Sequence, residues 1–419
     1  MSDDETVNNR YSSHGTLPKN VQILNPLSHT VLPKGFHRDP FHDCILSTVH
    51  HHQLAIESSS SQPFVAIHPS FLSLLTPEAT IRVISQDTKA FAHEAGVWVE
   101  QTEEVWFTSN LYHGSSSADK SVDVTRIHLE SGRIDVVPLD EIKTANGACP
   151  YGDYLLVCDQ GLGLEYPSQL ILIDPVSPPY SCIAILNNFN GRAFNSLNDV
   201  IVLPPRGPTS VLPPSPPMTH SSLTSRIAPA GSTVWFTDPA YGYEQGYKRK
   251  PQLPSQVYCF VPQTGVVRAV ADGFDHPNGI AFSPNGRVCY ITDTAHIAGT
   301  GVLDASKSST IYAFDVVWPE EGDLGNAGPT LQNRRLFAFA DCVKCDTRGN
   351  VYSGCGDGLH IWNEYGTLIG KMQVIARSRD GNKGASCANF CFVPGGRIVC
   401  LSEDRIYLIE GLCVEGALL

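Results

Sequence analysis

The chain has 419 residues, of which 42% are hydrophobic and 17% charged, and its formal net charge is −13 at pH 7. This composition supports a large buried core and excludes a chain that is disordered throughout. The acidic balance disfavours nucleic acid and anionic membrane surfaces as partners, because binding to phosphates needs clustered Lys and Arg.

The cysteines and the N-terminal segment favour a cytoplasmic protein. Thirteen cysteines are spread from Cys44 to Cys413, an odd number without the spacing of a disulfide scaffold. The segment MSDDETVNNR is acidic and polar, unlike a secretory signal or a mitochondrial presequence. No stretch approaches the roughly 18 apolar residues of a membrane-spanning helix. We therefore expect a cytoplasmic location and no membrane segment.

The first predicted segment in chain order is a polar, irregular N-terminal extension, residues 1–62. It contains three adjacent histidines, His50, His51 and His52. Neighbouring residues of a strand point to opposite faces, so these three cannot bind one metal ion from a strand. From residue 63 onward the chain consists of short β-type runs separated by Gly, Pro, Asn and Asp, and amphipathic helical windows are nearly absent.

These β-type runs recur in a fixed order. The clearest unit is HPNGIAFSPNGRVCYITDT (276–294) followed by STIYAFDVV (309–317), which reads as strand, tight turn, strand, loop and strand. Six copies of this pattern begin near residues 94, 146, 198, 278, 341 and 389. Apart from insertions, their spacing is about 50 residues, which suits four-stranded blades. The repeats predict an all-β fold, a six-bladed β-propeller.

A propeller must also close its ring, because an open ring leaves an exposed sheet edge. The last copy ends at DRIYLIE (404–410) with about three strands. The run TIRVIS (80–85), which precedes the first copy, is predicted to supply the missing outer strand. Residues 63–419 are then one propeller domain, closed by a strand from the N-terminal part of the chain.

One segment does not fit a strand. Residues 204–231 are rich in Pro, Ser and Thr and interrupt a hairpin between NDVIVL and STVWFTD. We interpret this insert as a flexible surface excursion. The alternative is a docking peptide read through polyproline recognition.

Candidate functional residues lie where the predicted inner strands begin, because these ends converge at one mouth of the central channel. The residues at these positions are Glu94, Asn198, Asn278 and Asp341. Two carboxylates and two amides form an all-oxygen set, which hard divalent cations prefer. Calcium fits best, with Mg²⁺, Mn²⁺ or Zn²⁺ as alternatives.

An ordered set of segments gives the chain a specific resemblance. NSLNDVIV, STVWFTDPAYG, HPNGIAFSPNGRVCYITDT and GNVYSGCGDGLHIWNEYGTLIGK lie between about residues 90 and 410. Together they resemble the regucalcin–gluconolactonase family, the senescence-marker-protein type of calcium-dependent lactonases. The resemblance implies a six-bladed propeller, in agreement with the repeats.

The resemblance also implies roles for single residues. By motif match the metal ligands are Glu94, Asn198, Asn278 and Asp341, and Asp341 is the general base. The family usually has Pro-Asp-Gly at the last ligand, where this chain reads Ala340-Asp341-Cys342. Cys342 and Cys345 have CxxC spacing, but they fall in a predicted inner strand, so we do not interpret them as a redox pair.

Two further polar residues are predicted to line the substrate pocket. Asn195 precedes the ligand Asn198, and Asp238 lies in the DPAYG turn. No Gly-x-Ser-x-Gly elbow, P-loop or dinucleotide fingerprint is present. A serine-hydrolase mechanism and a nucleotide cofactor therefore have no support.

The leading functional hypothesis is a divalent-metal-dependent hydrolase that opens a lactone or related cyclic ester of a small-molecule substrate. One alternative uses the same pocket for a non-hydrolytic cyclisation or isomerisation in a biosynthetic pathway, which an apolar rim would favour because such chemistry excludes water. The other alternative is a non-catalytic, metal-binding propeller.

Overall fold

The computed structural model describes residues 19–26, 30–31, 62–113, 120–205, 231–319, 328–339, 342–356, 358–374 and 387–417. Asp341 and residues 206–230 of the insert lie outside these described residues. The described chain is nearly all β, with one 3₁₀-helix, η3 (Pro69–Leu74), and one short α-helix, α4 (Tyr241–Glu244). Among the described residues, no helix has the length and apolar character needed to cross a membrane.

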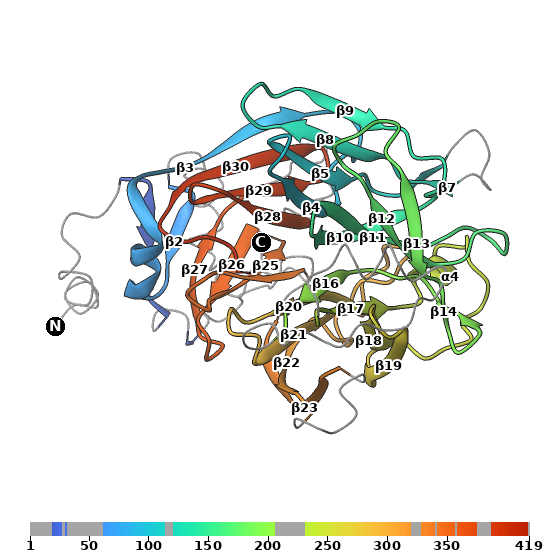
Figure 1. Ribbon diagram of the computed structural model, residues 1–419. Helices are drawn as coiled ribbons and strands as arrows, with labels where there is room; N and C mark the ends of the chain where they lie inside the picture. Colours follow the sequence, from blue (N-terminus) through green and yellow to red (C-terminus); the bar gives the residue numbers. More distant parts are fainter. Residues whose placement is uncertain are drawn as a thin grey trace.

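Six four-stranded antiparallel units form the propeller (Figure 1). Blade 1 contains β4 (Glu94–Val99), β5 (Glu104–Thr108), β8 (Val124–His128) and β9 (Ile134–Val137). Blade 2 contains β10 (Ala145–Tyr151), β11 (Tyr154–Asp159), β12 (Gln169–Ile173) and β13 (Cys182–Leu186). Blade 3 contains β16 (Val200–Leu203), β17 (Thr233–Asp238), β18 (Gln256–Val261) and β19 (Val266–Ala271).

The remaining blades follow the same order. Blade 4 contains β20 (Pro277–Phe282), β21 (Val288–Asp293), β22 (Thr310–Val317) and β23 (Thr330–Ala338). Blade 5 contains β24 (Val343–Cys345), β25 (Val351–Cys355), β26 (Gly358–Trp362) and β27 (Leu368–Met372). Blade 6 contains β28 (Asn389–Val393), β29 (Arg397–Ser402), β30 (Arg405–Leu412) and β3 (Leu75–Gln86). Two small hairpins, β6 (Tyr112–His113) with β7 (Lys120–Ser121) and β14 (Asn188–Phe189) with β15 (Arg192–Ala193), lie outside the blades.

The six-bladed propeller and its closing strand are confirmed. The inner strands begin within two residues of the six predicted starts, and β3, which contains TIRVIS, pairs antiparallel with β30. In Figure 1 the blue β3 lies beside the red β30, so the two ends of the described chain share blade 6. This pairing covers the outer edge of β30 and leaves no open blade edge at the junction.

Blade 5 carries two additional strands. β2 (Phe64–Ala66) pairs antiparallel with β27, and β1 (Val21–Ile23) pairs in parallel with β2. β1 lies within the extension that the sequence pattern describes as irregular. Its pairing partner in blade 5 is distant in sequence, so a local pattern over three residues does not reveal it.

A hydrophobic cluster fills each of the six interfaces between blades. Trp106 and Val157 meet between blades 1 and 2, for example, and Trp235 packs on Phe282 between blades 3 and 4. Strands in the middle of a blade are covered on both faces, so β17 (TVWFTD) is buried along its whole length. Continuous apolar runs therefore replace the alternation of a one-sided sheet.

Glycine allows neighbouring inner strands to approach each other. A Cβ atom on Gly147 of β10 would lie 2.5 Å from the carbonyl oxygen of Asn198 and 2.6 Å from Asp199 Oδ1. The Gly147 amide instead donates a 2.7 Å hydrogen bond to that carbonyl. Blades 2 and 3 are thus joined by backbone contact at the end of the channel where the candidate residues lie.

Candidate functional site

Three asparagines occupy the same position in successive blades. Each lies two residues before the point where the inner strand resumes regular pairing, at Ala148, Val200 and Ile280. These asparagines are Asn146 in blade 2, Asn198 in blade 3 and Asn278 in blade 4. The strand register therefore brings two of the predicted ligands, Asn198 and Asn278, to equivalent places around the channel.

Asn198 is buried, with only 4% of its surface exposed. Its backbone is fixed on both sides, because its amide donates to the Thr237 carbonyl at 3.0 Å and its carbonyl accepts from Gly147. Its side-chain Oδ1 is buried and has no hydrogen-bond partner among the described residues. Leaving a buried polar atom without a hydrogen bond costs about 1–3 kcal/mol. We therefore expect a bound ion or ligand to contact this oxygen.

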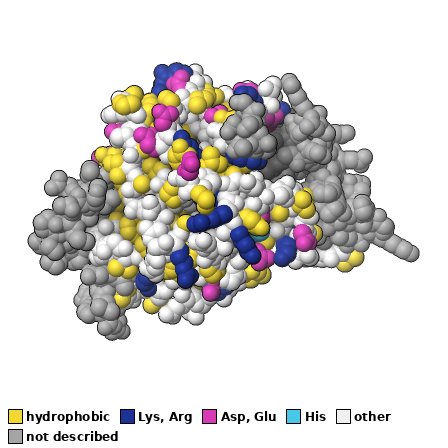
Figure 2. Space-filling model, turned by 90° about the vertical axis from the view of Figure 1, so that its right-hand side faces the viewer, with side chains coloured by type: hydrophobic (Ala, Val, Ile, Leu, Met, Phe, Trp, Pro, Cys, Tyr) yellow, Lys and Arg dark blue, Asp and Glu magenta, His cyan; other side chains and the backbone are white. Residues whose placement is uncertain are grey.

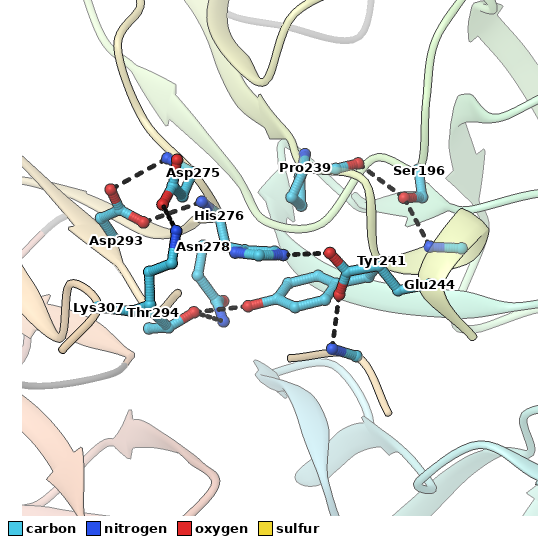
Figure 3. A network of polar contacts seen from close by, with 12 residues as sticks. Ser196, Pro239, Tyr241, Glu244, Asp275, His276, Asn278, Asp293, Thr294 and Lys307 are labelled. Atoms are coloured by element: carbon cyan, nitrogen blue, oxygen red, sulfur yellow. Dashed lines mark hydrogen bonds and ion pairs between the residues drawn. The ribbon is translucent and has the colours of Figure 1, made fainter. Parts of the chain in front are cut away.

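Asn278 is oriented by a short chain of hydrogen bonds (Figure 3). Its Nδ2 donates to Thr294 Oγ1 at 3.1 Å, and the Thr294 hydroxyl lies 2.6 Å from the Tyr241 hydroxyl. Its backbone carbonyl accepts a 2.7 Å hydrogen bond from Thr237 Oγ1, the neighbour of Asn198 in blade 3. Because Nδ2 is directed to Thr294, the Oδ1 atom of the same amide points away from Thr294.

Tyr241 is itself held by contacts between α4 and the beginning of blade 4. Its ring stacks on His276, with centroids 4.9 Å apart, and His276 Nε2 lies 2.7 Å from Glu244 Oε1. The other oxygen of Glu244 accepts a 2.7 Å hydrogen bond from the Gly299 amide. Figure 3 shows Tyr241, His276 and Glu244 side by side above Asn278. The α4 segment thus fixes the phenol that contacts Thr294.

Glu94 begins β4 and lies one position earlier than the asparagines. Its pairing partner is Thr108, and Ala95, which occupies the asparagine position in blade 1, has a positive φ of 58°. Asn389 of blade 6 donates from Nδ2 to Glu94 Oε2, so the carboxylate is held across the junction between the last blade and the first. Glu94 has a longer side chain than Asn, so its carboxylate can extend toward the asparagines although it comes from one position earlier in its strand.

A half-buried carboxylate anchors the segment that leads to Glu94. Glu403 accepts a 3.1 Å hydrogen bond from Asn110 Nδ2, and its other oxygen lies 2.7 Å from His93 Nδ1. Burial acts to raise the pKa of Glu403, but the charge and hydrogen bond of His93, with the bond from Asn110, keep it below its ordinary value. The ionised Glu403 therefore fixes the residue just before Glu94.

Asp199 directly follows Asn198 in the sequence, and its carboxylate links two blades. Its two oxygens accept hydrogen bonds from the amides of Val200 (2.9 Å) and Ile280 (3.0 Å), which joins blades 3 and 4. Burial raises the pKa of Asp199, while the positive charge of Lys344 in blade 5 acts to lower it. Lys344 of β24 thus places a positive charge near Asp199 and the inner strands.

Asp238 ends the second strand of blade 3, and an aspartate occupies the same place in blades 2 and 4. Its oxygens accept the backbone amides of Asn195 (3.0 Å) and Ser196 (2.9 Å). Asp159 in blade 2 and Asp293 in blade 4, which also end a second strand, likewise each accept two amides from the segments around the strand ends. Burial raises the pKa of Asp238 to about 7. Asp238 is fully buried, and these contacts hold the loop that leads to Asn198.

Asn195 lies on that loop and is also buried. Its Nδ2 donates to the Leu253 carbonyl at 3.1 Å, which ties the loop to the segment after α4. Asn195 also lines a surface pocket together with residues of that segment. The structure therefore places Asn195 beside a cavity, and it places Asp238 beneath the same loop.

Asp341, the fourth predicted ligand and the predicted base, lies outside the described residues. Its neighbour Cys342 packs against Gly279, whose added Cβ would lie 3.2 Å from the Cys342 Cα. Cys342 and Cys345 are buried free thiols. In the described part of the chain no three His, Cys, Asp or Glu side chains gather as a metal-binding group, as expected where two of four predicted donors are amides.

Sequence reasoning missed Asn146, Thr294 and Asn389. The signal for Asn146 was present, because ANG at 145–147 matches the PNG that contains Asn278. Thr294 and Asn389 gave no such signal: Thr294 contacts Asn278 across the β20–β21 hairpin, and Asn389 contacts Glu94 from a segment 295 residues away.

Comparison with known proteins agrees with the fold and motifs. Residues 224–379 match the family model described as SMP-30/gluconolactonase/LRE-like region. The lactonohydrolase oryH of Aspergillus oryzae is 33% identical over 342 residues, covering 67% of this chain and 68% of oryH. Lactonohydrolase oryL of the same organism is 27% identical over 308 residues, covering 68% of this chain, and the match spans only 61% of the length of oryL.

A solved structure gives the same result for the fold. The gluconolactonase of Xanthomonas campestris superposes with a TM-score of 0.58 at 21% identity, covering 84% of this chain and 95% of that one. At this identity the likeness shows the propeller fold alone. Taken with the family model and the match to oryH, the motifs show that this chain belongs to the SMP-30/gluconolactonase/LRE-like family.

Proposed function

We propose that this protein hydrolyses a lactone or related cyclic ester of a small-molecule substrate at the mouth of its central channel, with the help of a divalent cation. The observation that carries the proposal is the buried Oδ1 of Asn198, which has no hydrogen-bond partner among the described residues. Family membership and the names of the lactonohydrolase relatives support lactone opening as the reaction.

The described donors fit a hard cation. Glu94, Asn198 and Asn278 offer carboxylate and amide oxygens from three inner strands, and Asp341 would complete an all-oxygen set. Such ligands suit Ca²⁺ best among common ions, and Mg²⁺, Mn²⁺ and Zn²⁺ are the alternatives to compare. Asn389 and Thr294 would hold Glu94 and Asn278 in fixed orientations, as residues that hydrogen-bond to metal ligands commonly do.

Glu94, Asn198, Asn278 and Asp341 are called the oxygen ring below. In this proposal the chain binds the lactone so that the lactone carbonyl lies against this oxygen ring. A bound divalent cation would supply Lewis-acid polarisation of that carbonyl. The Asp341 carboxylate would take a proton from the attacking water and deliver it to the alcohol oxygen that leaves as the ring opens. Lys344 adds a positive charge that favours the negative charge developing on the carbonyl oxygen.

The reaction can be tested by recording acid release on a panel of lactones in a pH-stat. EDTA-treated protein should be inactive, and activity should return on adding one of the four cations. If no lactone releases acid at a metal-dependent rate, the proposal fails, and a non-catalytic metal-binding propeller remains.

One observation favours a second candidate, a non-hydrolytic cyclisation or isomerisation. Loops at the end of the propeller where the inner strands begin expose apolar side chains, among them Leu164, Tyr243 and Val302. An apolar rim helps to exclude water, which such chemistry requires. Mass spectrometry separates the two reactions, since hydrolysis adds the mass of one water and isomerisation adds none.

A further inference from the structure

A pocket lies between three segments at the end of the propeller where the inner strands begin. Its walls come from the loop after β11, the segment that leads into β16 and the segment after α4. These parts are tied together, because the Gly163 amide donates to the Tyr247 carbonyl at 2.9 Å and Lys248 Nζ donates to the Tyr166 carbonyl at 3.4 Å. The pocket is thus part of a braced structure.

The pocket is cationic in an acidic protein. Lys248, Arg249 and Lys250 line it, and its described lining residues include no Asp or Glu, whereas the whole chain has a net charge of −13. Lys248 is half-buried; burial lowers its pKa, and the buried carboxylates Asp159 and Asp238 act in the opposite sense. Figure 2 views the side of the molecule where α4 lies in Figure 1, and there Lys and Arg side chains stand among hydrophobic ones.

The pocket is also apolar on part of its wall. Leu164, Pro167 and Phe194 line it beside the three cations. A simple inorganic anion would leave this apolar surface unused. The combination suits an organic anion, in which a carboxylate meets the cations and the carbon skeleton packs on the apolar residues.

The pocket lies within reach of the oxygen ring. Asn195 lines the pocket, and Asn198 follows three residues later in the same segment. Three residues of fully extended chain span at most about 11 Å, which sets an upper limit on the separation of their Cα atoms. The pocket therefore adjoins the segment that carries Asn198, and a substituent long enough to cover this separation would bring a charged group of the substrate to the cations.

We propose that this pocket binds a carboxylate of the substrate, so that the preferred substrate is a lactone that carries an acidic substituent. This inference rests on the proposed lactone hydrolysis. Lys248 and Arg249 with Lys250 provide the charge for the carboxylate, and Leu164 and Pro167 contact the carbon chain. The product of ring opening is then a hydroxy-dicarboxylate.

The test compares two matched substrates, a γ-butyrolactone that carries a carboxylic acid and the primary amide of the same compound. Ring opening is followed by NMR, and kcat/KM is determined for each. The wild type should favour the acid by about tenfold, equivalent to about 1.4 kcal/mol. The preference should fall as salt is raised, because exposed charges are screened.

The variants separate charge from folding. Arg249→Gln with Lys250→Gln changes two exposed side chains, and Lys248→Met keeps the alkyl stem that packs against Gly242. Both should reduce the preference toward one, chiefly by lowering kcat/KM for the acid. The control is Arg287→Gln, an exposed cation in the turn between β20 and β21, which should keep the preference.

Failure of the inference differs from failure of the proposed function. If both lactones are opened equally well, or the pocket variants keep the preference for the acid, the carboxylate site is wrong and lactone hydrolysis stands. A preference for a phosphorylated sugar lactone over the lactone acid also overturns it. If neither lactone opens, calorimetric titration with the ring-opened hydroxy-dicarboxylate decides: tighter binding to the wild type than to the pocket variants supports the site, and equal or absent binding overturns it.

Discussion

At the scale of single residues, the candidate site is built from side chains whose orientation is set by hydrogen bonds to residues of the same blade or of the next one. Asn278 is directed by Thr294, and Glu94 by Asn389 from the far end of the chain. Asn198 differs, because its Oδ1 has no hydrogen-bond partner among the described residues. Two oriented oxygens and one unsatisfied oxygen describe a site that is pre-organised before any ligand enters it.

Removing the hydroxyl of Thr294 tests this orientation. Thr294→Val keeps the shape of the side chain but loses the oxygen that accepts from Asn278 Nδ2, so this orientation of the amide loses one of its supports. We expect Ca²⁺ affinity, measured by calorimetry, to fall about 10-fold or more, as for other residues that support metal ligands. Thr294→Ser keeps the hydroxyl and should bind Ca²⁺ nearly as the wild type does. Equal affinity in Thr294→Val and Thr294→Ser would show that Thr294 does not position Asn278.

The predicted ligands were accessible to sequence reasoning because they recur in register. Asn198 and Asn278 precede similar strands, so their shared place in the repeat predicts that they lie around one axis. The partner Asn389 was not accessible, because its contact with Glu94 spans 295 residues of sequence. The sequence predicts that Asp238 lines the substrate pocket. In the structure its oxygens accept hydrogen bonds from the amides of the loop that it supports.

At the scale of secondary-structure elements, the strand β3 determines whether the sheet of blade 6 is complete. It covers the edge of β30 and packs through Ile81 against the cluster between blades 5 and 6. β1 and β2 instead extend blade 5 beyond the four strands that it shares with the other blades. The closing strand was predictable from the missing fourth strand of the last repeat. The added strands were not, since no gap in the repeats calls for them.

Two truncations separate these contributions. Removing residues 1–62 deletes β1 but keeps β2 and β3, so we expect a folded propeller with a somewhat lower melting temperature. Removing residues 1–86 also deletes β3 and exposes the edge of β30, so we expect an insoluble or aggregating chain. Circular dichroism and size-exclusion chromatography report both outcomes. A monomeric, cooperatively unfolding 87–419 chain would contradict the role of β3 in closing the ring.

At the scale of the whole molecule, closure of the ring brings the candidate residues together. Each interface between blades has its own hydrophobic cluster, and the cluster between blades 6 and 1 joins the last blade to the first. Glu94, Asn198 and Asn278 come from three different blades, so no single blade contains the site. The site therefore depends on the complete propeller, and the insert at 204–231 leaves the order of the strands on either side of it intact.

The proposed metal site is tested most directly by measuring the rate of lactone opening against Ca²⁺ concentration for the wild type, Asn278→Ala and Asp341→Asn. Asn278→Ala removes a neutral donor, so activity should return as Ca²⁺ is raised. Asp341→Asn keeps an oxygen but removes the base, so its rate at saturating Ca²⁺ should stay about 10²–10⁴-fold below the wild type. If Ca²⁺ restores Asp341→Asn as fully as Asn278→Ala, Asp341 is not the base. Wild-type dependence on Ca²⁺ in both variants would contradict the proposed four-residue site.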